Sequence, residues 1–339
     1  MRVAQLIDNK IKVNDVKKIE LEGKKGAIVE VLGCGLCGSD IVKFIHSSVK
    51  NGTVLGHEIV AEIVDINSDT TLKKGDRIVC SHHIPCFECE YCKGESYSMC
   101  AHFKKTNIVP GGFSEYVYIS EEHLQNVAHK VPKDITDEEI SFYEPLGCCI
   151  RAIERAQLKP NSNVLVIGLG SIGILMGQAL KAYGMTVYGC DLMQERIDLA
   201  ISKGIIGFNS YDMIKSHDFI YNNTNSIGAD CIFMTSGADA AIPLALKTVR
   251  NGGKILVFSS TPKDFGYANN DVYYRELTIL GSYSPRPIDL KKSFKLLTSG
   301  QVNVKNLSTE YNIENIAEAF NDTIENKILK AYIKIGVKE

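Results

Sequence analysis

A glycine-rich turn constrains the fold of this chain more than any other feature of its sequence. Residues 164–173 read VLVIGLGSIG, the pattern G-x-G-x-x-G placed directly after an apolar segment and directly before an amphipathic one. Gly168 permits a tight turn, Gly170 lets a pyrophosphate approach the backbone, and Gly173 allows a helix to pack closely on a sheet. The turn therefore predicts a strand–turn–helix unit that binds a dinucleotide.

The segments that follow this turn predict a doubly wound parallel sheet. Ser171 and Ile172 open the first helix, whose N-terminal N–H groups attract phosphates. Apolar strands then alternate with helices, as in repeated strand–helix–strand units. The expected strands are 164–167, 186–190, 230–235 and 254–259, and the expected helices are 172–183, 194–203 and 238–249. We expect Asn251-Gly252-Gly253 to form the turn before strand 254–259.

An acidic residue at the end of the second expected strand favours NAD over NADP. Asp191 lies eighteen residues after Gly173. Its carboxylate can accept hydrogen bonds from both hydroxyls of the adenine ribose, and it repels a 2′-phosphate. Arg196 lies close enough to weaken that discrimination. An ordinary turn followed by an accidental Asp remains the alternative interpretation.

The first third of the chain reads differently, as short apolar-alternating segments broken by Gly and Asp. This pattern predicts a compact β domain. Its expected strands are 26–31, 58–65, 76–80 and 112–119. A length of 339 residues suits two domains. The N-terminal residues carry charges where a signal peptide is apolar, and no apolar run reaches the length of a membrane span, so we expect a cytoplasmic protein.

Four cysteines within fifteen residues predict a structural zinc site. They are Cys86, Cys89, Cys92 and Cys100. Four thiolates complete a tetrahedral zinc shell and leave no open position, which is typical of structural zinc. The segment 86–100 could also be a zinc ribbon that binds nucleic acid. However, it contains three glutamates and the chain has a net charge of −2, so we expect no nucleic-acid partner.

Three further segments carry residues that could form a second, open zinc site. They contain Cys37, His57 and Glu144. A cysteine, a histidine and a carboxylate, with water or substrate as the remaining ligand, make a catalytic zinc site. The spacing does not show that these segments meet in space. Taken alone, His57 could be a core histidine and Glu144 an exposed residue at a helix start.

In its combination and order of motifs, the chain resembles the zinc-dependent medium-chain dehydrogenase/reductase family, in the branch of sorbitol, polyol and threonine dehydrogenases. The resemblance covers nearly the whole chain. The matching segments are Cys37-Gly38-Ser39-Asp40, Gly56-His57-Glu58, Lys74-Gly75-Asp76-Arg77, the cysteine segment, 111–116 (GGFSEY), Glu144-Pro145 and the glycine-rich turn. It implies a GroES-like β catalytic domain made of residues 1–147 and 286–339, with the zinc lobe 86–100, and a Rossmann NAD-binding domain made of residues 148–285.

The resemblance also implies roles for individual residues. Cys37 and His57 would bind the catalytic zinc, and Glu144 would hold the third ligand position, for which Cys148 is an alternative. Glu58 would approach the metal directly or through water, and Asp40 would orient His57. Ser39 would pass the alcohol proton outward, unless it is only a turn residue. The histidine that often follows in relatives is missing, so water, Lys43, His46 or the cofactor ribose would continue the proton route.

The function implied is hydride transfer between NAD and a secondary alcohol of a polyol, sugar or related small alcohol, with zinc polarising the substrate oxygen. A sugar phosphate or an amino-alcohol such as threonine is the alternative substrate, and a non-catalytic dinucleotide sensor is the alternative class. Arg286 could bind an anionic substrate group, or it could be a surface residue. The expected cleft-lining residues are Phe44, Phe113, Tyr143 and Tyr283. The expected assembly is a homodimer or homotetramer, with strands 255–258 and 277–280 pairing across a two-fold axis.

His82 and His83, beside the cysteine segment, could also bind metal. We interpret them instead as a pair at a strand end near the active cleft.

Overall fold

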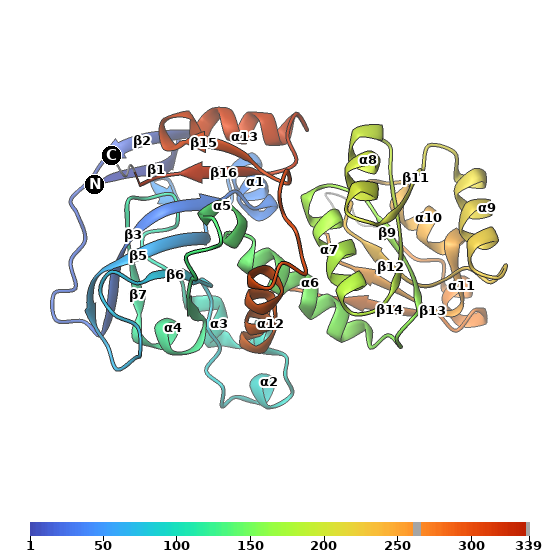
Figure 1. Cartoon of the computed structure of the whole chain (residues 1–339), viewed down its shortest axis with the longest axis horizontal. Helices are drawn as coiled ribbons and strands as arrows, with labels where there is room; N and C mark the ends of the chain where they lie inside the picture. The colour runs from blue at the N-terminus through green and yellow to red at the C-terminus, as the bar shows by residue number, and fades with distance from the viewer. Residues whose placement is uncertain (260–265, 337–339) are drawn as a thin grey trace. The chain divides into compact units, whose positions relative to one another are not determined.

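The computed structural model describes residues 1–259 and 266–336 of the chain. They form two compact units (Figure 1). The first unit contains Met1–Pro145, Arg286–Gly300 and Val304–Glu339, and the second contains Leu146–Pro285 and Gln301–Asn303. Among the described residues, no helix combines the length and the apolarity that a membrane crossing requires.

The first unit is built on two β-sheets. A three-stranded sheet has the order β2-β1-β4, and a seven-stranded sheet has the order β15-β16-β3-β5-β6-β8 with β7 paired to β3. The strands are β1 (Arg2–Ile7), β2 (Lys10–Asp15), β3 (Gly26–Gly35), β4 (Thr53–Val54), β5 (Glu58–Asn67), β6 (Arg77–Cys80), β7 (Tyr116–Ser120), β8 (Ala128–Lys130), β15 (Thr309–Asn312) and β16 (Ala331–Lys334). Strand β3 is buried along nearly its whole length, so it forms the centre of this unit's core.

Short helices connect and cover these strands. They are α1 (Gly38–Ile45), α2 (Glu90–Lys93), η1 (Tyr97–Met99), α3 (Ala101–Lys105), α4 (Glu121–Asn126), α5 (Asp137–Ile140), α12 (Pro287–Thr298), η2 (Ile313–Asn315) and α13 (Ile316–Ile324). The boundary between the units falls within α6 (Tyr143–Ala156). The strand expected at 112–119 begins only at Tyr116, because Gly112 and Phe113 instead donate backbone hydrogen bonds to the segment before β5.

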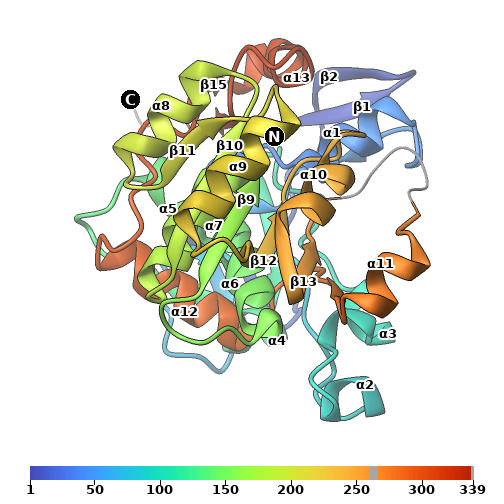
Figure 2. The same cartoon turned by 90° about the vertical axis from the view of Figure 1, so that its right-hand side faces the viewer.

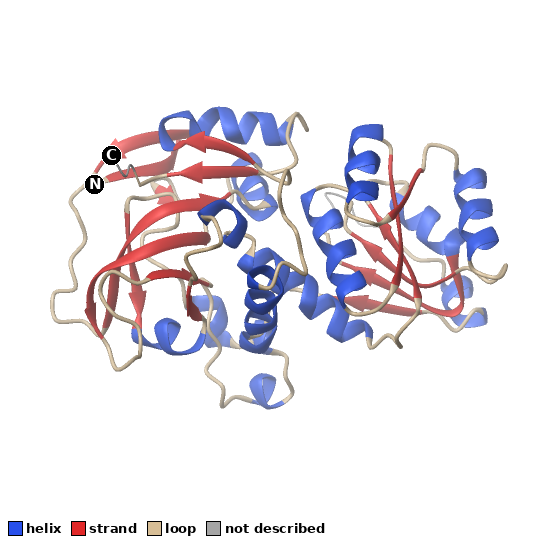
Figure 3. Ribbon diagram, viewed as in Figure 1, coloured by secondary structure: helices blue, strands red, loops and turns tan. Residues whose placement is uncertain are grey.

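The second unit is a doubly wound parallel sheet. Its strand order is β11-β10-β9-β12-β13-β14, which is 3-2-1-4-5-6 in chain order, and all its pairs are parallel. Helices pack around the strands (Figures 2 and 3). The strands are β9 (Asn163–Ile167), β10 (Thr186–Asp191), β11 (Ile206–Asn209), β12 (Ala229–Met234), β13 (Val249–Val257) and β14 (Thr278–Gly281); the helices are α7 (Ser171–Ala182), α8 (Gln194–Ser202), α9 (Met213–Asn223), α10 (Ala241–Thr248) and α11 (Asn269–Tyr274).

Two expectations for this unit are wrong. The Asn251-Gly252-Gly253 segment is not a separate turn but lies within β13, where the pairing register with β12 shifts between Ala229 and Cys231. The extra residues form an irregularity that Gly252 accommodates with a φ of 66°. Strand 255–258 cannot pair across a two-fold axis, because β13 already pairs with β12 and β14.

Candidate active site and metal centres

The four side chains predicted for an open zinc site come from three places in the first unit. Cys37 is the N-cap residue of α1, His57 directly precedes β5, and Glu58 is the first residue of that strand. Glu144 lies in the first turn of α6 and is only 5% exposed. The fold therefore collects these residues from segments far apart in the sequence.

The potential ligand atoms form two overlapping groups that share His57. In the first group, one ligand atom each of Cys37, His57 and Glu58 lie within 4.8 Å of one another. In the second group, the same holds for His57, His82 and Glu144. Sulfur, imidazole nitrogen and carboxylate oxygen are the ligands that zinc takes in proteins, so this donor set fits zinc. Cys148, the alternative ligand, belongs to neither group of described residues.

Asp40 holds the ring of His57 in place. Its Oδ2 lies 3.5 Å from His57 Nδ1, and its carboxylate also accepts weaker contacts from the backbone N–H groups of Cys37 and Gly56. Burial opposes the charge of Asp40, but His57 outweighs it and lowers the pKa of this carboxyl. Burial likewise opposes the His57 cation, but Asp40 and Cys37 raise the pKa of His57 well above its usual value.

Two glycines near this site let neighbouring side chains approach the backbone closely. Gly56 has a φ of 88°, and a side chain there would collide with Phe113. A Cβ atom on Gly35 would lie 2.0 Å from Glu58 Oε2. Gly35 therefore leaves the space that the Glu58 carboxylate occupies.

Lys330 forms a buried ion pair with Glu58. The two side chains are 3% and 1% exposed, and Lys330 Nζ also donates to the carbonyl oxygen of Leu36 at 3.1 Å. Burial opposes the ammonium charge, but Glu58 and Cys37 outweigh it and raise the pKa of Lys330. Sequence reasoning missed this lysine. Its only signal was a cation directly before the apolar strand β16.

His82 is the other residue that sequence reasoning left outside the site. Its ring centroid lies 4.4 Å from that of His57 and 3.9 Å from that of His83. Burial, together with His57 and His83, lowers the pKa of His82 well below its usual value. The signal in the sequence was the pair His82-His83 at the end of a predicted strand.

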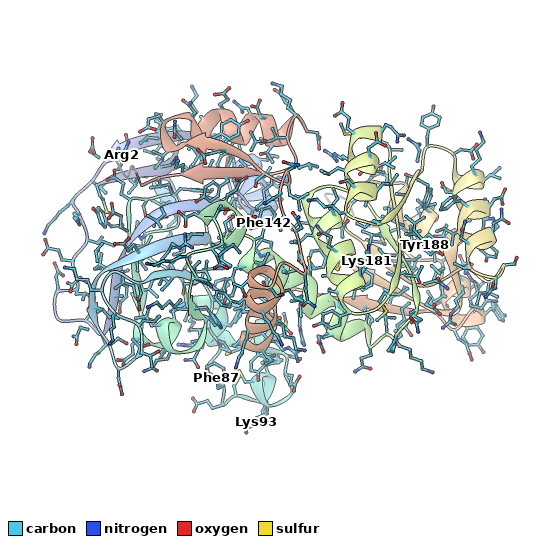
Figure 4. The ribbon with its side chains drawn as sticks, in the orientation of Figure 1. Arg2, Phe87, Lys93, Phe142, Lys181 and Tyr188 are labelled. Carbon is cyan, nitrogen blue, oxygen red and sulfur yellow. The ribbon has the colours of Figure 1, made fainter. Side chains whose placement is uncertain are left out.

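The cysteine lobe brings its four sulfurs into one group. Three of the sulfur–sulfur distances are 3.5 Å for Cys86–Cys100, 3.6 Å for Cys89–Cys92 and 3.9 Å for Cys86–Cys92. A tetrahedron with Zn–S bonds of about 2.3 Å has edges of about 3.8 Å, so these distances fit zinc. Burial disfavours the Cys100 thiolate, but N–H groups of Cys86 and Phe103 outweigh it and bring its pKa to about 6. In Figure 4, Phe87 and Lys93 mark this lobe.

The glycine-rich turn lies between β9 and α7. Gly168 has a φ of 96°, and a Cβ atom on Gly173 would lie 1.8 Å from Gly168 O, so a side chain there would push the helix off the turn. A Cβ atom on Gly170 would meet nothing within 4 Å. That open approach at the start of α7, beside Ser171 and Ile172, can receive a phosphate group.

Asp191 ends β10, the strand next to the turn. Its Oδ2 accepts a hydrogen bond from Leu169 N at 2.7 Å, and its Oδ1 accepts from Leu192 N and Met193 N at 2.8 and 3.0 Å. Arg196 Nη1 lies 3.9 Å from Asp191 Oδ2. Backbone donors thus hold the carboxylate at the edge of the phosphate-binding turn.

Several other predicted residues have clear positions. Ser39 lies exposed in the first turn of α1, and Lys43 Nζ lies 3.9 Å from Asp40 Oδ1. Phe113 and Tyr143, expected to line the cleft, are instead buried in the core of the first unit. Tyr143 donates to Val127 O at 2.9 Å.

Arg286 pairs with carboxylates of its own chain. Two of its nitrogens each donate to an oxygen of Asp289 at 2.9 Å, and its third nitrogen pairs with Glu95. These contacts take the paired donors that an anionic substrate group would need.

Comparison with known proteins identifies the family to which both parts of the chain belong. Residues 23–133 match the model of the alcohol dehydrogenase GroES-like domain, and residues 171–299 match that of the zinc-binding dehydrogenases. The chain belongs to the zinc-dependent medium-chain dehydrogenase family. It is therefore an oxidoreductase that uses zinc and a nicotinamide dinucleotide, and the predicted family, fold class and enzyme class are confirmed.

Individual relatives match the sequence or the structure of this medium-chain dehydrogenase along almost its full length. The probable D-xylulose reductase A of Aspergillus terreus is 29% identical over 339 residues, which is 96% of this chain and 95% of that protein. Galactitol-1-phosphate dehydrogenase from Escherichia coli has a TM-score of 0.86 at 24% identity and covers 98% of this chain and 100% of its own. The 2R,3R-butanediol dehydrogenase from Bacillus subtilis has a TM-score of 0.85 at 23% identity, with coverages of 98% and 99%. These two structures share its fold.

Proposed function

We propose that this medium-chain dehydrogenase oxidises a secondary alcohol of a polyol or sugar with NAD, and reduces the ketone in the reverse direction. The observation that carries the proposal is the mixed group of Cys37, His57 and Glu58, with the buried carboxylate of Glu144 beside it. Such a group leaves a position for a substrate oxygen, unlike the four-sulfur lobe. The similar protein from Aspergillus terreus is named a probable D-xylulose reductase, and D-xylulose is a ketose, which supports a polyol as the product of reduction.

In this proposal Cys37, His57 and Glu144 would be the three protein ligands of the catalytic zinc, and Glu58 would approach it directly or through water, so that one position stays open for the substrate oxygen. When bound, the zinc lowers the pKa of a substrate hydroxyl and the nicotinamide accepts the hydride. Asp40 contacts Nδ1 of His57, which would leave Nε2 as the nitrogen that holds the metal. Lys330 and Gly35 fix where the Glu58 carboxylate can lie.

Ser39 is proposed to take the proton that the alcohol loses. It lies two residues after Cys37 and is exposed on α1, so a proton can pass from it to water. Lys43, near Asp40 on the same helix, is a further candidate for that outward route. The four cysteines of the lobe are proposed to hold a structural zinc that takes no part in the chemistry.

The second unit is proposed to bind NAD, and the first to carry the zinc chemistry. Gly168, Gly170 and Gly173 form the turn under the pyrophosphate, and Asp191 faces the adenine ribose. The carboxylate would repel the 2′-phosphate of NADP, which supports NAD. Arg196 Nη1 lies 3.9 Å from that carboxylate and forms a long ion pair with it.

Neutral polyols are favoured over sugar phosphates because Arg286 is paired with Asp289 and Glu95. We further propose a homodimer or homotetramer that uses β14, one of the two edge strands of the parallel sheet, as a pairing surface. A cytoplasmic location is proposed because the sulfurs of Cys86, Cys89, Cys92 and Cys100 gather as zinc ligands do, and such a set of thiolates suits a reducing compartment.

The test is the initial rate of NAD reduction with a series of neutral polyols, a sugar phosphate and threonine. Each rate is repeated with NADP and after treatment with a chelator. The proposal predicts a chelator-sensitive rate with a neutral polyol and NAD. Turnover of threonine alone would show that the substrate is an amino-alcohol and not a polyol. NADH binding without turnover of any alcohol would favour the dinucleotide sensor.

A further inference from the structure

The peptide group between Gly168 and Leu169 is held from two neighbouring strands. Its carbonyl oxygen accepts a hydrogen bond from the Thr235 hydroxyl, with an Oγ1–O distance of 2.8 Å. Its N–H donates to Oδ2 of Asp191, with an N–O distance of 2.7 Å. One peptide plane of the glycine-rich turn therefore connects the Thr235 hydroxyl to the carboxylate that is proposed to select the cofactor.

The register of the parallel sheet places both side chains beside the turn. Strand β9 lies between β10 and β12, and its last residue, Ile167, pairs with Cys190 of β10 and Met234 of β12. Asp191 and Thr235 are the next residues along the two flanking chains. The strand order reverses between β9 and β12, and doubly wound sheets bind dinucleotides at such a point.

The Thr235 hydroxyl has a single proton to donate, and we assign it to Gly168. Oγ1 lies 2.8 Å from the Gly168 oxygen and 3.1 Å from the Ile167 oxygen. The Ile167 oxygen already accepts the backbone N–H of Thr235 at 3.1 Å. The closer oxygen, that of Gly168, therefore receives the hydroxyl proton, and this hydrogen bond opposes rotation of the peptide plane.

Thr235 also packs closely against the glycines of the turn. A Cβ atom on Gly173 would lie 3.0 Å from Thr235 Oγ1, and one on Gly168 would lie 2.8 Å from the Cβ atom of Ser236. Valine has nearly the shape of threonine but no hydroxyl donor. Thr235→Val therefore keeps most of this packing and removes the hydrogen bond to the Gly168 oxygen.

The direction of the Asp191 carboxylate depends on its backbone donors. Oδ1 accepts hydrogen bonds from the N–H groups of the two residues that follow Asp191, whereas the N–H of Leu169 donates to Oδ2. If the peptide before Leu169 rotates, Oδ2 loses that donor, while Arg196 Nη1 lies 3.9 Å away. The carboxylate then turns toward Arg196, which weakens its contact with ribose hydroxyls and its repulsion of a 2′-phosphate.

We propose that Thr235 is a positioning residue for cofactor selection, because it holds the Gly168–Leu169 peptide so that its N–H keeps the Asp191 carboxylate directed at the adenine ribose. This inference rests on the proposed preference for NAD and names a residue that acts on the cofactor through the turn. A hydrogen bond to a charged group changes binding by about tenfold or more. We therefore expect loss of the Thr235 hydroxyl to lower the preference for NADH over NADPH about tenfold.

The experiment measures the dissociation constants of NADH and NADPH from the fluorescence of the reduced nicotinamide, so it requires no substrate. It compares wild type with Thr235→Val, Thr235→Ser, Asp191→Ser and the double variant Thr235→Val with Asp191→Ser. The matched control is Thr248→Val, which removes a fully buried hydroxyl that donates to Leu244 O at 2.7 Å within α10. Circular dichroism checks the fold of each variant, and Thr235→Ala replaces Thr235→Val if the latter does not give a native spectrum.

We expect Thr235→Val to lower the ratio of the NADPH to the NADH dissociation constant about tenfold, mainly through weaker binding of NADH. Thr235→Ser keeps the hydroxyl and should keep the wild-type ratio, and Thr248→Val should keep it as well. In the presence of Asp191→Ser, Thr235→Val should change the ratio no further, because the carboxylate that Thr235 positions is absent.

An unchanged ratio in Thr235→Val, including an equal loss of affinity for both cofactors, overturns this inference alone. Additive effects on the ratio in the double variant also overturn it, since Thr235 would then act independently of Asp191. A wild type that binds NADPH as tightly as NADH overturns the proposed preference for NAD and this inference together.

Discussion

Replacing Lys330 by Met removes the cation from the buried pair with Glu58 and keeps most of the side chain's volume. Both side chains are almost fully buried, so the Glu58 carboxylate is left without its main counter-charge in a poorly solvated position. Breaking a buried ion pair in this way costs about 3–5 kcal/mol. We expect Lys330→Met to lower the free energy of unfolding of the zinc-loaded protein by about 3 kcal/mol, because zinc compensates part of the carboxylate charge.

The measurement is urea unfolding followed by circular dichroism, since the chain has no tryptophan. The matched control is Lys93→Met, which breaks the pair with Glu90, whose side chains are 63% and 87% exposed. Lys93→Met should lower the free energy of unfolding by less than about 1 kcal/mol. The double variant Lys330→Met with Glu58→Gln should recover most of the loss. A cost below about 1 kcal/mol for Lys330→Met, or strictly additive effects in the double variant, would refute the reasoning.

Three further predictions concern the turn, the cofactor and the N-terminus. Gly173→Ala places a Cβ atom 1.8 Å from Gly168 O and should weaken NADH binding at least tenfold in a fluorescence titration; wild-type affinity would contradict the packing argument. Asp191→Ser should lower the NAD-to-NADP ratio of kcat/KM at least tenfold, and an unchanged ratio would show that this carboxylate does not select the cofactor. Burial opposes the charge of Glu115, but the backbone N–H and guanidinium of Arg2 outweigh it and lower the pKa of Glu115. Its contribution is therefore present above the unfolded pKa and lost as pH falls through the folded one, so Glu115→Gln should cost about 1 kcal/mol at pH 7 and progressively less as the solution is acidified through the folded pKa; a cost that grows on acidification would be inconsistent with this pairing.

Local patterns in the sequence predicted the features whose physical cause is also local. The glycine-rich turn and the alternation of strands and helices predicted the parallel sheet, because each unit depends on neighbouring residues. The cysteine lobe was equally predictable from the sequence, since its four cysteines lie within fifteen residues. The role of Asn251-Gly252-Gly253 was misread, because a register irregularity within a strand and a tight turn use the same residues.

The open metal group depends on distant segments, so only part of it was predictable. Cys37, His57 and Glu144 were candidates by their chemistry, but nothing in their spacing showed that they approach one another. The pairing of Lys330 with Glu58 could not be predicted from the sequence, because it depends on β16, near the C-terminus, pairing with β3. His82 was set aside because a histidine at a strand end is usually structural, and its place within 4.8 Å of ligand atoms of His57 and Glu144 follows only from the fold.

The central claim is that two different zinc sites exist and that only the one at Cys37 does chemistry. The most direct measurement is the zinc content and the rate of NAD reduction of Cys37→Ala beside wild type, with circular dichroism to check the fold. The account predicts two zinc ions per wild-type chain, and one zinc ion, a native spectrum and no measurable turnover for Cys37→Ala. Two zinc ions or a wild-type rate in Cys37→Ala would contradict it.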